Sequence, residues 1–304
     1  MTADQLHALD EMLRTGPLDL GGDLQEQRRL LVELLTAIPL PDDVRTKPGD
    51  LAGVPVIVID IDRSDASPNN NGVLLYLHGG AYAMGTAQAS LGLASDVARR
   101  AQTRAITVDY RLAPEHPYPA ALDDAVAAYA ALLETTDPAD VALVGESAGG
   151  GLVLATLVAL RDRGLPMPSA AAVFSPWADL TLSGATATTK ADVDVAVTAA
   201  GLRTRGAEYV GTADATTPTI SPVFADLTGL PPLLIQAGSH EILLDDALRI
   251  AANAAVADVA VDLQITPGAP HVFQGFAAVL TEGDMALTAA GEFLRAHLVG
   301  GGRA

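Results

Sequence analysis

Short apolar segments alternate with helical segments along most of this chain, and this alternation constrains its fold more than any other feature. The predicted strands lie at residues 54–61, 73–77, 104–109, 141–144, 170–174, 233–237 and 261–266. Helical patterns occupy residues 89–101, 120–133, 152–161, 246–256 and 282–297. Short apolar strands separated by helices are typical of a parallel sheet that is buried on both faces. The sequence therefore predicts an α/β protein with a mostly parallel, doubly wound sheet.

Two regions stand outside this alternation. Residues 1–48 contain two predicted helices, and the second runs from about residue 24 to residue 37, before two prolines. Residues 182–220, here called the insertion, are rich in Thr and Ala and contain no apolar strand. Such an insertion commonly covers a site at the strand ends, although a plain surface excursion is the alternative. We expect the two regions to form a helical cap on a catalytic domain at residues 49–304.

A serine bracketed by glycines follows one of the predicted strands. Strand 141–144 leads into Gly145-Glu146-Ser147-Ala148-Gly149, and the helical run 152–161 comes next. A sharp strand-to-helix turn exposes the serine hydroxyl, and glycines on both sides avoid collisions with the neighbouring strand and helix. The pattern is typical of a nucleophile elbow and predicts Ser147 as a nucleophile. A purely structural loop rich in Gly and Ser is the alternative interpretation.

An activated serine needs a base, and the base needs an acid that orients it. His271 lies in the loop after the last predicted strand, which reaches the same sheet edge as the Ser147 turn. The loop after strand 233–237 offers three carboxylates for the role of the acid, and they are Glu241, Asp245 and Asp246. Glu241 is our choice because it is closest to the strand end. Asp245 is the second choice, because it also suits the start of the next helix.

Backbone amides must also face the negative charge that develops on an attacked carbonyl oxygen. The stretch His78-Gly79-Gly80-Ala81-Tyr82 directly follows a strand and exposes amides without bulky side chains. The amides of Gly79, Gly80 and Ala148 are predicted to form this oxyanion hole, and His78 is expected to fix the loop by hydrogen bonding. A Gly pair after a strand can also hold a phosphate, but the stretch contains no GxGxxG pattern and no P-loop lysine.

Composition excludes several classes of function. The net charge is −19, from 37 acidic and 18 basic residues, which disfavours nucleic acid and anionic lipid as partners. The chain has no Cys, so disulfides and thiolate chemistry are excluded, and no zinc-ligand spacing is present. No transmembrane segment or secretory signal is visible in the sequence. We expect a cytoplasmic protein that needs no metal or organic cofactor and is not inserted in a membrane.

Several longer motifs resemble those of one enzyme family. They are HGGAY at 78–82, DYRLAPEHPYPAALDD at 109–124, GESAGG at 145–150, SPWADL at 175–180, PPLLIQAGSHEILLDD at 231–246 and HVF at 271–273. Together they resemble the hormone-sensitive-lipase-like branch, bacterial family IV, of the α/β-hydrolases, and the resemblance covers residues 50–300. Two positions depart from the family pattern. The elbow carries Glu146 where Asp is more common, and Glu241 stands where the family usually has Asp followed by Pro-Leu.

The resemblance implies a carboxylesterase with Ser147, Glu241 and His271 as its triad and with an oxyanion hole from the His-Gly-Gly loop. It also implies a cap made from the N-terminal helices and the insertion, and it allows a homodimer. Because the insertion is rich in Thr and charged residues, we expect short- to medium-chain esters as substrates. Tyr82 and Trp177 are candidates to line the substrate pocket, and core packing is the equal alternative for Trp177.

Two other functions remain open at this stage. An amidase or deacetylase would use the same triad on a different substrate. A small-molecule receptor on the same scaffold is a third reading, since plant gibberellin receptors resemble this family. Those receptors lack the catalytic histidine, whereas this chain retains His271. The acidic pair Asp123 and Asp124 is expected to have a structural role.

Overall fold

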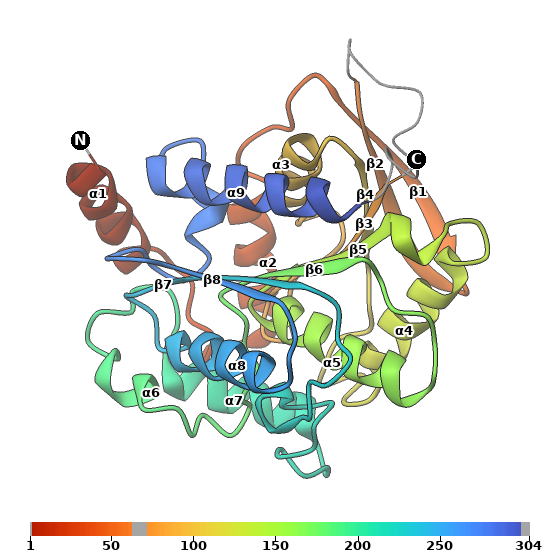
Figure 1. Cartoon of the computed structure of the whole chain (residues 1–304). Helices are drawn as coiled ribbons and strands as arrows, with labels where there is room; N and C mark the ends of the chain where they lie inside the picture. The colour runs from red at the N-terminus through yellow and green to blue at the C-terminus, as the bar shows by residue number, and fades with distance from the viewer. Residues whose placement is uncertain (1, 63–71, 299–304) are drawn as a thin grey trace.

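A single eight-stranded sheet forms the centre of the molecule (Figure 1). The computed structural model describes residues 2–62 and 72–298. The strands are β1 Val44–Leu51, β2 Val54–Ile61, β3 Val73–Leu77, β4 Arg104–Val108, β5 Val141–Glu146, β6 Ala170–Phe174, β7 Leu233–Gly238 and β8 Val261–Thr266. Their order in the sheet is β1-β2-β4-β3-β5-β6-β7-β8. Strands β1 and β2 pair antiparallel, as do β2 and β4, and the remaining pairs are parallel. The predicted mostly parallel sheet is confirmed.

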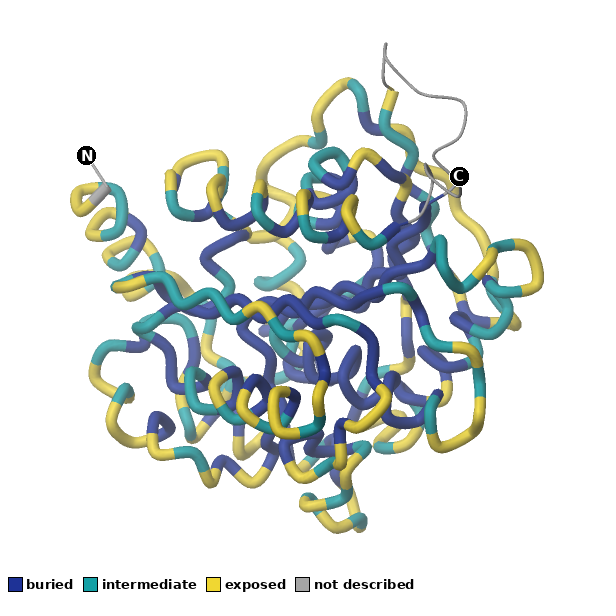
Figure 2. Tube along the Cα trace, viewed as in Figure 1, coloured by how far each residue is buried: buried dark blue, intermediate teal, exposed yellow. Residues whose placement is uncertain are grey.

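Helices cover both faces of the sheet. The α-helices are α1 Thr2–Arg14, α2 Leu24–Leu35, α3 Leu91–Ala101, α4 Ala120–Leu132, α5 Ala148–Asp162, α6 Thr186–Thr189, α7 Ala199–Val210, α8 Leu244–Val256 and α9 Thr281–His297. Short 3₁₀ turns lie at η1 Pro138–Asp140, η2 Pro222–Phe224 and η3 Phe273–Phe276. Helices α3 and α9 pack on one face, and α4, α5 and α8 pack on the other (Figure 1). The central strands are buried between these layers, and the exposed residues lie on the outer sides of the helices (Figure 2).

Strand β1 is an element that the sequence patterns did not predict. Apart from Val44, its residues are exposed or half-buried, so the strand lacks the apolar signal of its neighbours. It pairs along its whole length with β2, from Val44 opposite Ile61 to Leu51 opposite Val54. The expected start of the catalytic domain at residue 49 therefore falls inside a strand, and a boundary before Val44 fits the sheet better.

The insertion contains α6 and α7 and contacts the N-terminal region. Arg205 of α7 is almost fully buried, and its Nε donates to the carbonyl of Leu20 at 2.6 Å. A second nitrogen of the same guanidinium donates to the carbonyl of Gly22. These hydrogen bonds join the two regions that we expect to form the cap. Among the helices that the structure describes, none has the length and apolar character needed to cross a membrane.

Candidate active site

The turn between β5 and α5 has the geometry of a nucleophile elbow. Ser147 has φ of 54° and ψ of −124°, which is an unfavourable conformation for a residue with a side chain. Its amide donates to the carbonyl of Phe174 at 2.8 Å, and its carbonyl accepts from the amide of Trp177 at 2.9 Å. A Cβ atom at Gly149 would collide with the backbone of Leu77. Close packing and backbone hydrogen bonds therefore hold the serine in this strained position.

The structure brings the three predicted triad side chains together. The Oγ of Ser147 lies 2.9 Å from Nε2 of His271. The Nδ1 of His271 lies 2.7 Å from Oε2 of Glu241, which is completely buried. Since the carboxylate can only accept, Nδ1 carries the proton and the lone pair of Nε2 faces the serine. The three residues follow β5, β8 and β7, so they meet at the carboxyl edge of the sheet.

The loop that carries Glu241, residues 238–246, is here called the acid loop. The second carboxylate oxygen of Glu241, Oε1, accepts from the amide of Gly238 at 2.6 Å and from the hydroxyl of Ser175 at 3.0 Å. The hydroxyl of Ser175 also accepts from the amide of Val272, next to the histidine, at 3.0 Å. Every oxygen of the acid therefore has a partner, and Ser175 connects the acid to the loop of the base.

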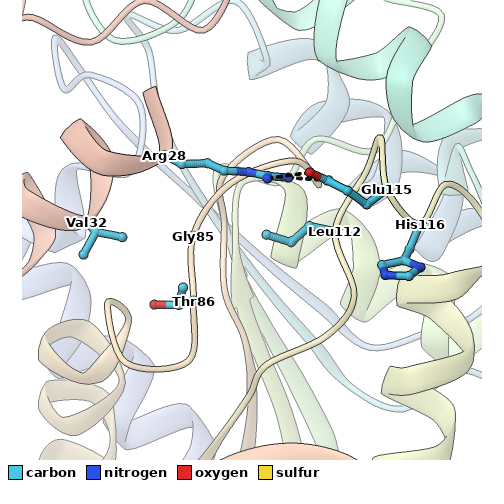
Figure 3. A pocket seen from close by; sticks show the side chains of 7 residues that line it. All are labelled: Arg28, Val32, Gly85, Thr86, Leu112, Glu115 and His116. Carbon is cyan, nitrogen blue, oxygen red and sulfur yellow. Dashed lines mark hydrogen bonds and ion pairs between the residues drawn. The ribbon is translucent and has the colours of Figure 1, made fainter. Parts of the chain in front are cut away.

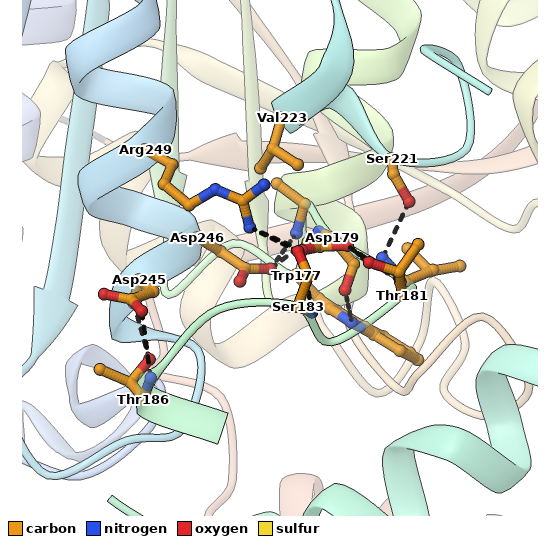
Figure 4. A network of polar contacts seen from close by, with 12 residues as sticks. Trp177, Asp179, Thr181, Ser183, Thr186, Ser221, Val223, Asp245, Asp246 and Arg249 are labelled. Atoms are coloured by element: carbon orange, nitrogen blue, oxygen red, sulfur yellow. Dashed lines mark hydrogen bonds and ion pairs between the residues drawn. The ribbon is translucent and has the colours of Figure 1, made fainter. Parts of the chain in front are cut away.

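The other two candidate acids are bonded to groups other than His271. Asp245 accepts from the amide of Thr186 at 3.1 Å, as Figure 4 shows. Asp246 is buried, and its Oδ2 accepts from the amides of Ala178 and Asp179, each at 2.8 Å. From the start of α8, Asp245 thus binds the insertion, and Asp246 binds the segment that precedes it. The geometry therefore favours Glu241 over Asp245 as the acid.

Buried carboxylates set the charge of the catalytic base. Burial of His271 opposes its charged form, whereas the hydrogen bond and the charge of Glu241 favour it. The charges of Asp194 and Glu146 act in the same direction, so the pKa of His271 is raised above its ordinary value. A base with a raised pKa accepts the serine proton more readily, although it must first be deprotonated.

The loop after β3, residues 78–85, is here called the oxyanion loop. The amide of Gly79 donates to Oε1 of Glu146 at 2.6 Å, so it is not free to bind an oxyanion. The expectation for Gly79 therefore needs correction. Within the described part of the chain, the amides of Gly80, Ala81 and Ala148 donate to no acceptor. Ala81 therefore replaces Gly79 as a candidate donor, beside the predicted Gly80 and Ala148.

Several polar contacts fix the oxyanion loop. The Nδ1 of His78 donates to the carbonyl of Gly79 at 2.7 Å, as expected for a residue that pins the loop. The ring of His78 stacks on Tyr110 at 4.2 Å between centroids, and the Tyr110 hydroxyl donates to the His78 carbonyl at 2.6 Å. Arg28 of α2 donates from Nε to the carbonyl of Ala83 at 2.8 Å. The N-terminal region thus binds the loop directly.

Tyr82 and Trp177 are packed in the core. Their exposed fractions are 1% and 0%, and their ring centroids lie 5.9 Å apart. Tyr82 also stacks on Tyr209 of α7 at 3.9 Å, and Nε1 of Trp177 donates to the carbonyl of Asp179 at 3.1 Å. These contacts favour the core-packing alternative for Trp177 and extend it to Tyr82. The two rings fix the position of α7 beside the elbow.

A cavity of about 300 Å³ lies between α2 and the segments that carry Gly85 and Leu112 (Figure 3). It is lined by Arg28, Val32, Gly85, Thr86, Leu112, Glu115 and His116, none of which belongs to the triad. The guanidinium of Arg28 and the carboxylate of Glu115 form an ion pair at 2.7 Å, which holds the pKa of Glu115 at about 2.

In residues 2–62 and 72–298, no cluster of His, Asp and Glu could hold a metal ion.

Three residues of the site were missed in the sequence. Ser175 and Glu146 lie in the motifs SPWADL and GESAGG, but neither motif indicates which atoms they contact. Asp194 comes from the insertion and reaches the acid loop, where its Oδ2 accepts from the amide of Ile242 at 2.7 Å.

Asp124 and Arg111 form an ion pair at 2.7 Å, in line with the structural role expected for that aspartate.

Known proteins share this fold. A family model described as the α/β hydrolase fold matches residues 74–275. The acetyl-hydrolase of Streptomyces hygroscopicus is 46% identical over 223 residues, which cover 73% of this chain and 75% of that protein. The crystal structure of an esterase from the bacterial hormone-sensitive lipase family is 41% identical, with a TM-score of 0.91 over 97% of this chain and 98% of that one. The structure of EstE5 soaked with p-nitrophenyl butyrate is 38% identical, with a TM-score of 0.90 and coverage of 97% and 98%.

Proposed function

Because the chain belongs to the hormone-sensitive-lipase-like esterases of the α/β-hydrolase fold, we propose that it cleaves short- to medium-chain esters through an acyl-enzyme on Ser147. One observation carries this proposal: unbroken hydrogen bonding from Ser147 through His271 to Glu241. The same observation argues against a receptor without catalysis, because such a receptor has no use for an aligned base.

Acylation begins when Ser147 attacks the ester carbonyl carbon. Nε2 of His271 takes the proton of Oγ while the new C–O bond forms. The carbonyl oxygen becomes an oxyanion, and the free amides of Gly80, Ala81 and Ala148 are the donors that stabilise it. The bond to the alcohol then breaks, and His271 returns its proton to the leaving alkoxide oxygen.

Deacylation repeats these steps with water as the nucleophile. His271 takes a proton from water, the hydroxide attacks the acyl carbonyl, and a second oxyanion forms in the same place. Its collapse breaks the bond to Ser147 and releases the carboxylic acid, and the proton goes back to the serine oxygen. In both halves Glu241 stays ionised and stabilises the imidazolium that forms.

The proposed acyl length rests on the insertion and on the relatives. The insertion carries Thr and charged residues rather than a large apolar lid. The name of the Streptomyces relative refers to acetyl groups, and the EstE5 crystals were soaked with a butyrate ester. We therefore infer that acetyl to butyryl esters are cleaved faster than long-chain esters, and that amides are poorer substrates than esters.

The direct test compares Ser147→Ala with Thr288→Ala, which removes a hydroxyl exposed on α9. p-Nitrophenyl acetate, butyrate and octanoate serve as substrates, with the matching p-nitroanilides. We expect the serine variant to lose hydrolysis and the control to keep it, while both variants keep the thermal transition of the wild type. Mass spectrometry after treatment with an organophosphate should place the adduct on Ser147. Undiminished turnover by the serine variant would refute the proposal, and faster cleavage of the anilides would reassign the enzyme as an amidase.

A further inference from the structure

Side chains of the insertion hydrogen-bond to both the amide and the carbonyl of the residue that follows the triad acid. The amide of Ile242 donates to Oδ2 of Asp194 at 2.7 Å, and its carbonyl accepts from Oγ1 of Thr186 at 2.8 Å. Ile242 itself is almost completely buried. Both polar backbone groups next to Glu241 are therefore satisfied by side chains from the insertion rather than by the sheet domain. Any shift of the insertion is transmitted directly to the acid.

Asp194 is a buried carboxylate, and burial raises its pKa above the ordinary value although three backbone amides favour the charged form. Its exposed fraction is 8%, and its Oδ1 accepts from the amides of Ala196 and Val197 at 2.9 Å each. Together with Ile242, all its hydrogen-bond partners are N–H donors. A protonated carboxyl would direct an O–H at a donor, so this arrangement suits the charged form. Burial without a cationic partner is costly, which makes a structural role alone a poor explanation for this residue.

Thr186 forms the second half of the same attachment, and Figure 4 shows this residue bonded to Asp245. Its hydroxyl donates to the carbonyl of Ile242 and accepts from the amide of Asp245 at 2.9 Å. Its own amide donates to the Asp245 carboxylate at 3.1 Å. Thr186 therefore restrains the backbone of the acid loop without adding charge. Asp194 thus contributes both position and charge, whereas Thr186 contributes position alone.

We propose that Asp194 is a positioning residue of the esterase, which fixes the acid loop through Ile242 and supplies a further buried negative charge to His271. The inference rests on the proposed function, in which Glu241 is the acid and His271 the base. The acidic groups whose charge acts on His271 are Glu241 from the acid loop, Asp194 from the insertion and Glu146 from the elbow, and the pKa of Glu146 is itself raised to about 7. Glu241 touches the ring directly, whereas Asp194 acts on it through the low-dielectric interior.

The charge of Asp194 has a defined consequence for catalysis. An imidazolium forms on His271 in each chemical step, and a nearby buried carboxylate stabilises that cation. Loss of the charge should lower the pKa of His271, so that the base stays deprotonated at lower pH. It should also slow the reaction at the pH plateau, because the cation that forms is less stable. A residue with only a structural role would lower activity without moving the acidic limb of the pH profile.

The first test is Asp194→Asn, with Asp192→Asn as the matched control. Asp192 is exposed on the same insertion, so the control removes the same formal charge two residues away. The readouts are kcat and KM for p-nitrophenyl butyrate between pH 5 and pH 9, together with the thermal transition. We expect the acidic limb of kcat/KM to move to lower pH and plateau kcat to fall about tenfold, since small misplacements of catalytic groups cost one to two orders of magnitude. KM and the control should change little. An acidic limb at the wild-type position would overturn the inference.

Thr186→Val and Thr186→Ser provide a second, independent test that does not depend on folding of the aspartate variant. Valine matches threonine in shape but cannot bond to Ile242, so we expect a lower kcat with an acidic limb at the wild-type pH. Serine retains the hydroxyl and should restore kcat. Wild-type kcat in the valine variant would contradict the attachment of the acid loop by the insertion.

Failure of the inference can be distinguished from failure of the proposed function. If Ser147→Ala is inactive while Asp194→Asn and Thr186→Val behave as the wild type, only the role of the insertion is refuted. If Ser147→Ala remains active, the proposed triad itself is wrong.

Discussion

The acid loop, residues 238–246, and the oxyanion loop, residues 78–85, belong to the same proposed catalytic centre but are held by different interactions. Buried side chains of the insertion, Asp194 and Thr186, bind the backbone of the acid loop. The oxyanion loop depends instead on tight backbone packing and on Arg28 of the N-terminal region. The first loop should therefore be sensitive to changes in charge and hydroxyl groups. The second should be sensitive to changes in volume.

The largest expected effect comes from neutralising the acid itself. Glu241→Gln should reduce kcat by about 10³ to 10⁴-fold, because a triad amide favours the wrong tautomer of the base. Asp245→Asn is the control, since Asp245 contacts Thr186 rather than His271 and its amide oxygen can still accept. Ester turnover and an unchanged thermal transition are the measurements. A greater loss in the Asp245 variant would transfer the role of the acid to that residue.

A larger side chain at Gly80 should displace the oxyanion loop. Gly80 has φ of 110°, and a Cβ atom there would collide with the backbone of Met84. Gly80→Ala should lower kcat roughly 10² to 10³-fold, comparable to the loss of one oxyanion donor. Gly53→Ala is the matched control, because Gly53 has φ of 85° but an open environment. If both variants lose activity equally, the effect is due to backbone strain and not to displacement of the loop.

Arg28 connects the N-terminal region to the oxyanion loop, and its removal should have an intermediate effect. Its guanidinium donates to the carbonyls of Ala83 and Ala113 and pairs with Glu115. Arg28→Ala should lower kcat about tenfold through loss of loop position, and it should destabilise the protein by about 2 kcal/mol. Arg29→Ala on the same helix removes only exposed pairs with Glu26 and Glu33, so it should be nearly neutral. Equal effects of the two variants in urea unfolding and in turnover would exclude the specific role of Arg28.

The last prediction concerns stability rather than turnover, and it centres on Glu146, whose carboxyl accepts from the oxyanion loop. Burial outweighs the hydrogen bond from Gly79 and raises the pKa of Glu146 to about 7. The native state thus binds this proton more tightly than the unfolded state, so its contribution to stability is full below about pH 4.5 and declines as pH rises through 7. Glu146→Gln keeps an acceptor for Gly79 and cannot ionise, so it should gain stability relative to the wild type between pH 5 and pH 8. The relative gain should be no more than about 3 kcal/mol. A constant difference in thermal stability across this range would contradict the raised pKa.

The strands, the serine turn and the histidine loop could be predicted because each depends on local sequence. Apolar runs mark buried strands, and the glycines around Ser147 mark a tight turn. Strand β1 escaped prediction because its polar residues pair with β2 at the edge of the sheet without entering the core. Helices α6 and α7 lie in a region where composition alone indicated only a long insertion.

Contacts between distant residues explain what the sequence could not indicate. Gly79 and Glu146 are 67 residues apart, and only their hydrogen bond reveals that this amide is occupied. Asp194 and Ile242 are 48 residues apart, so nothing near either residue marks the attachment of the acid loop. The choice between Glu241 and Asp245 likewise required the direction of each side chain, which spacing does not determine.

The hydrogen bonds of Arg205 bear on the order in which the protein can assemble. The guanidinium binds Leu20 and Gly22, which precede Arg205 by 185 and 183 positions in the chain. Closing so long a loop carries a substantial entropic cost. During synthesis the N-terminal segment has no such anchor until the chain has passed Arg205, when the residues of the serine turn have already been made. Glu241 and His271 emerge later still. Arg205, which attaches the N-terminal region to the insertion, is therefore synthesised before Glu241 and His271, the side chains proposed to activate the serine.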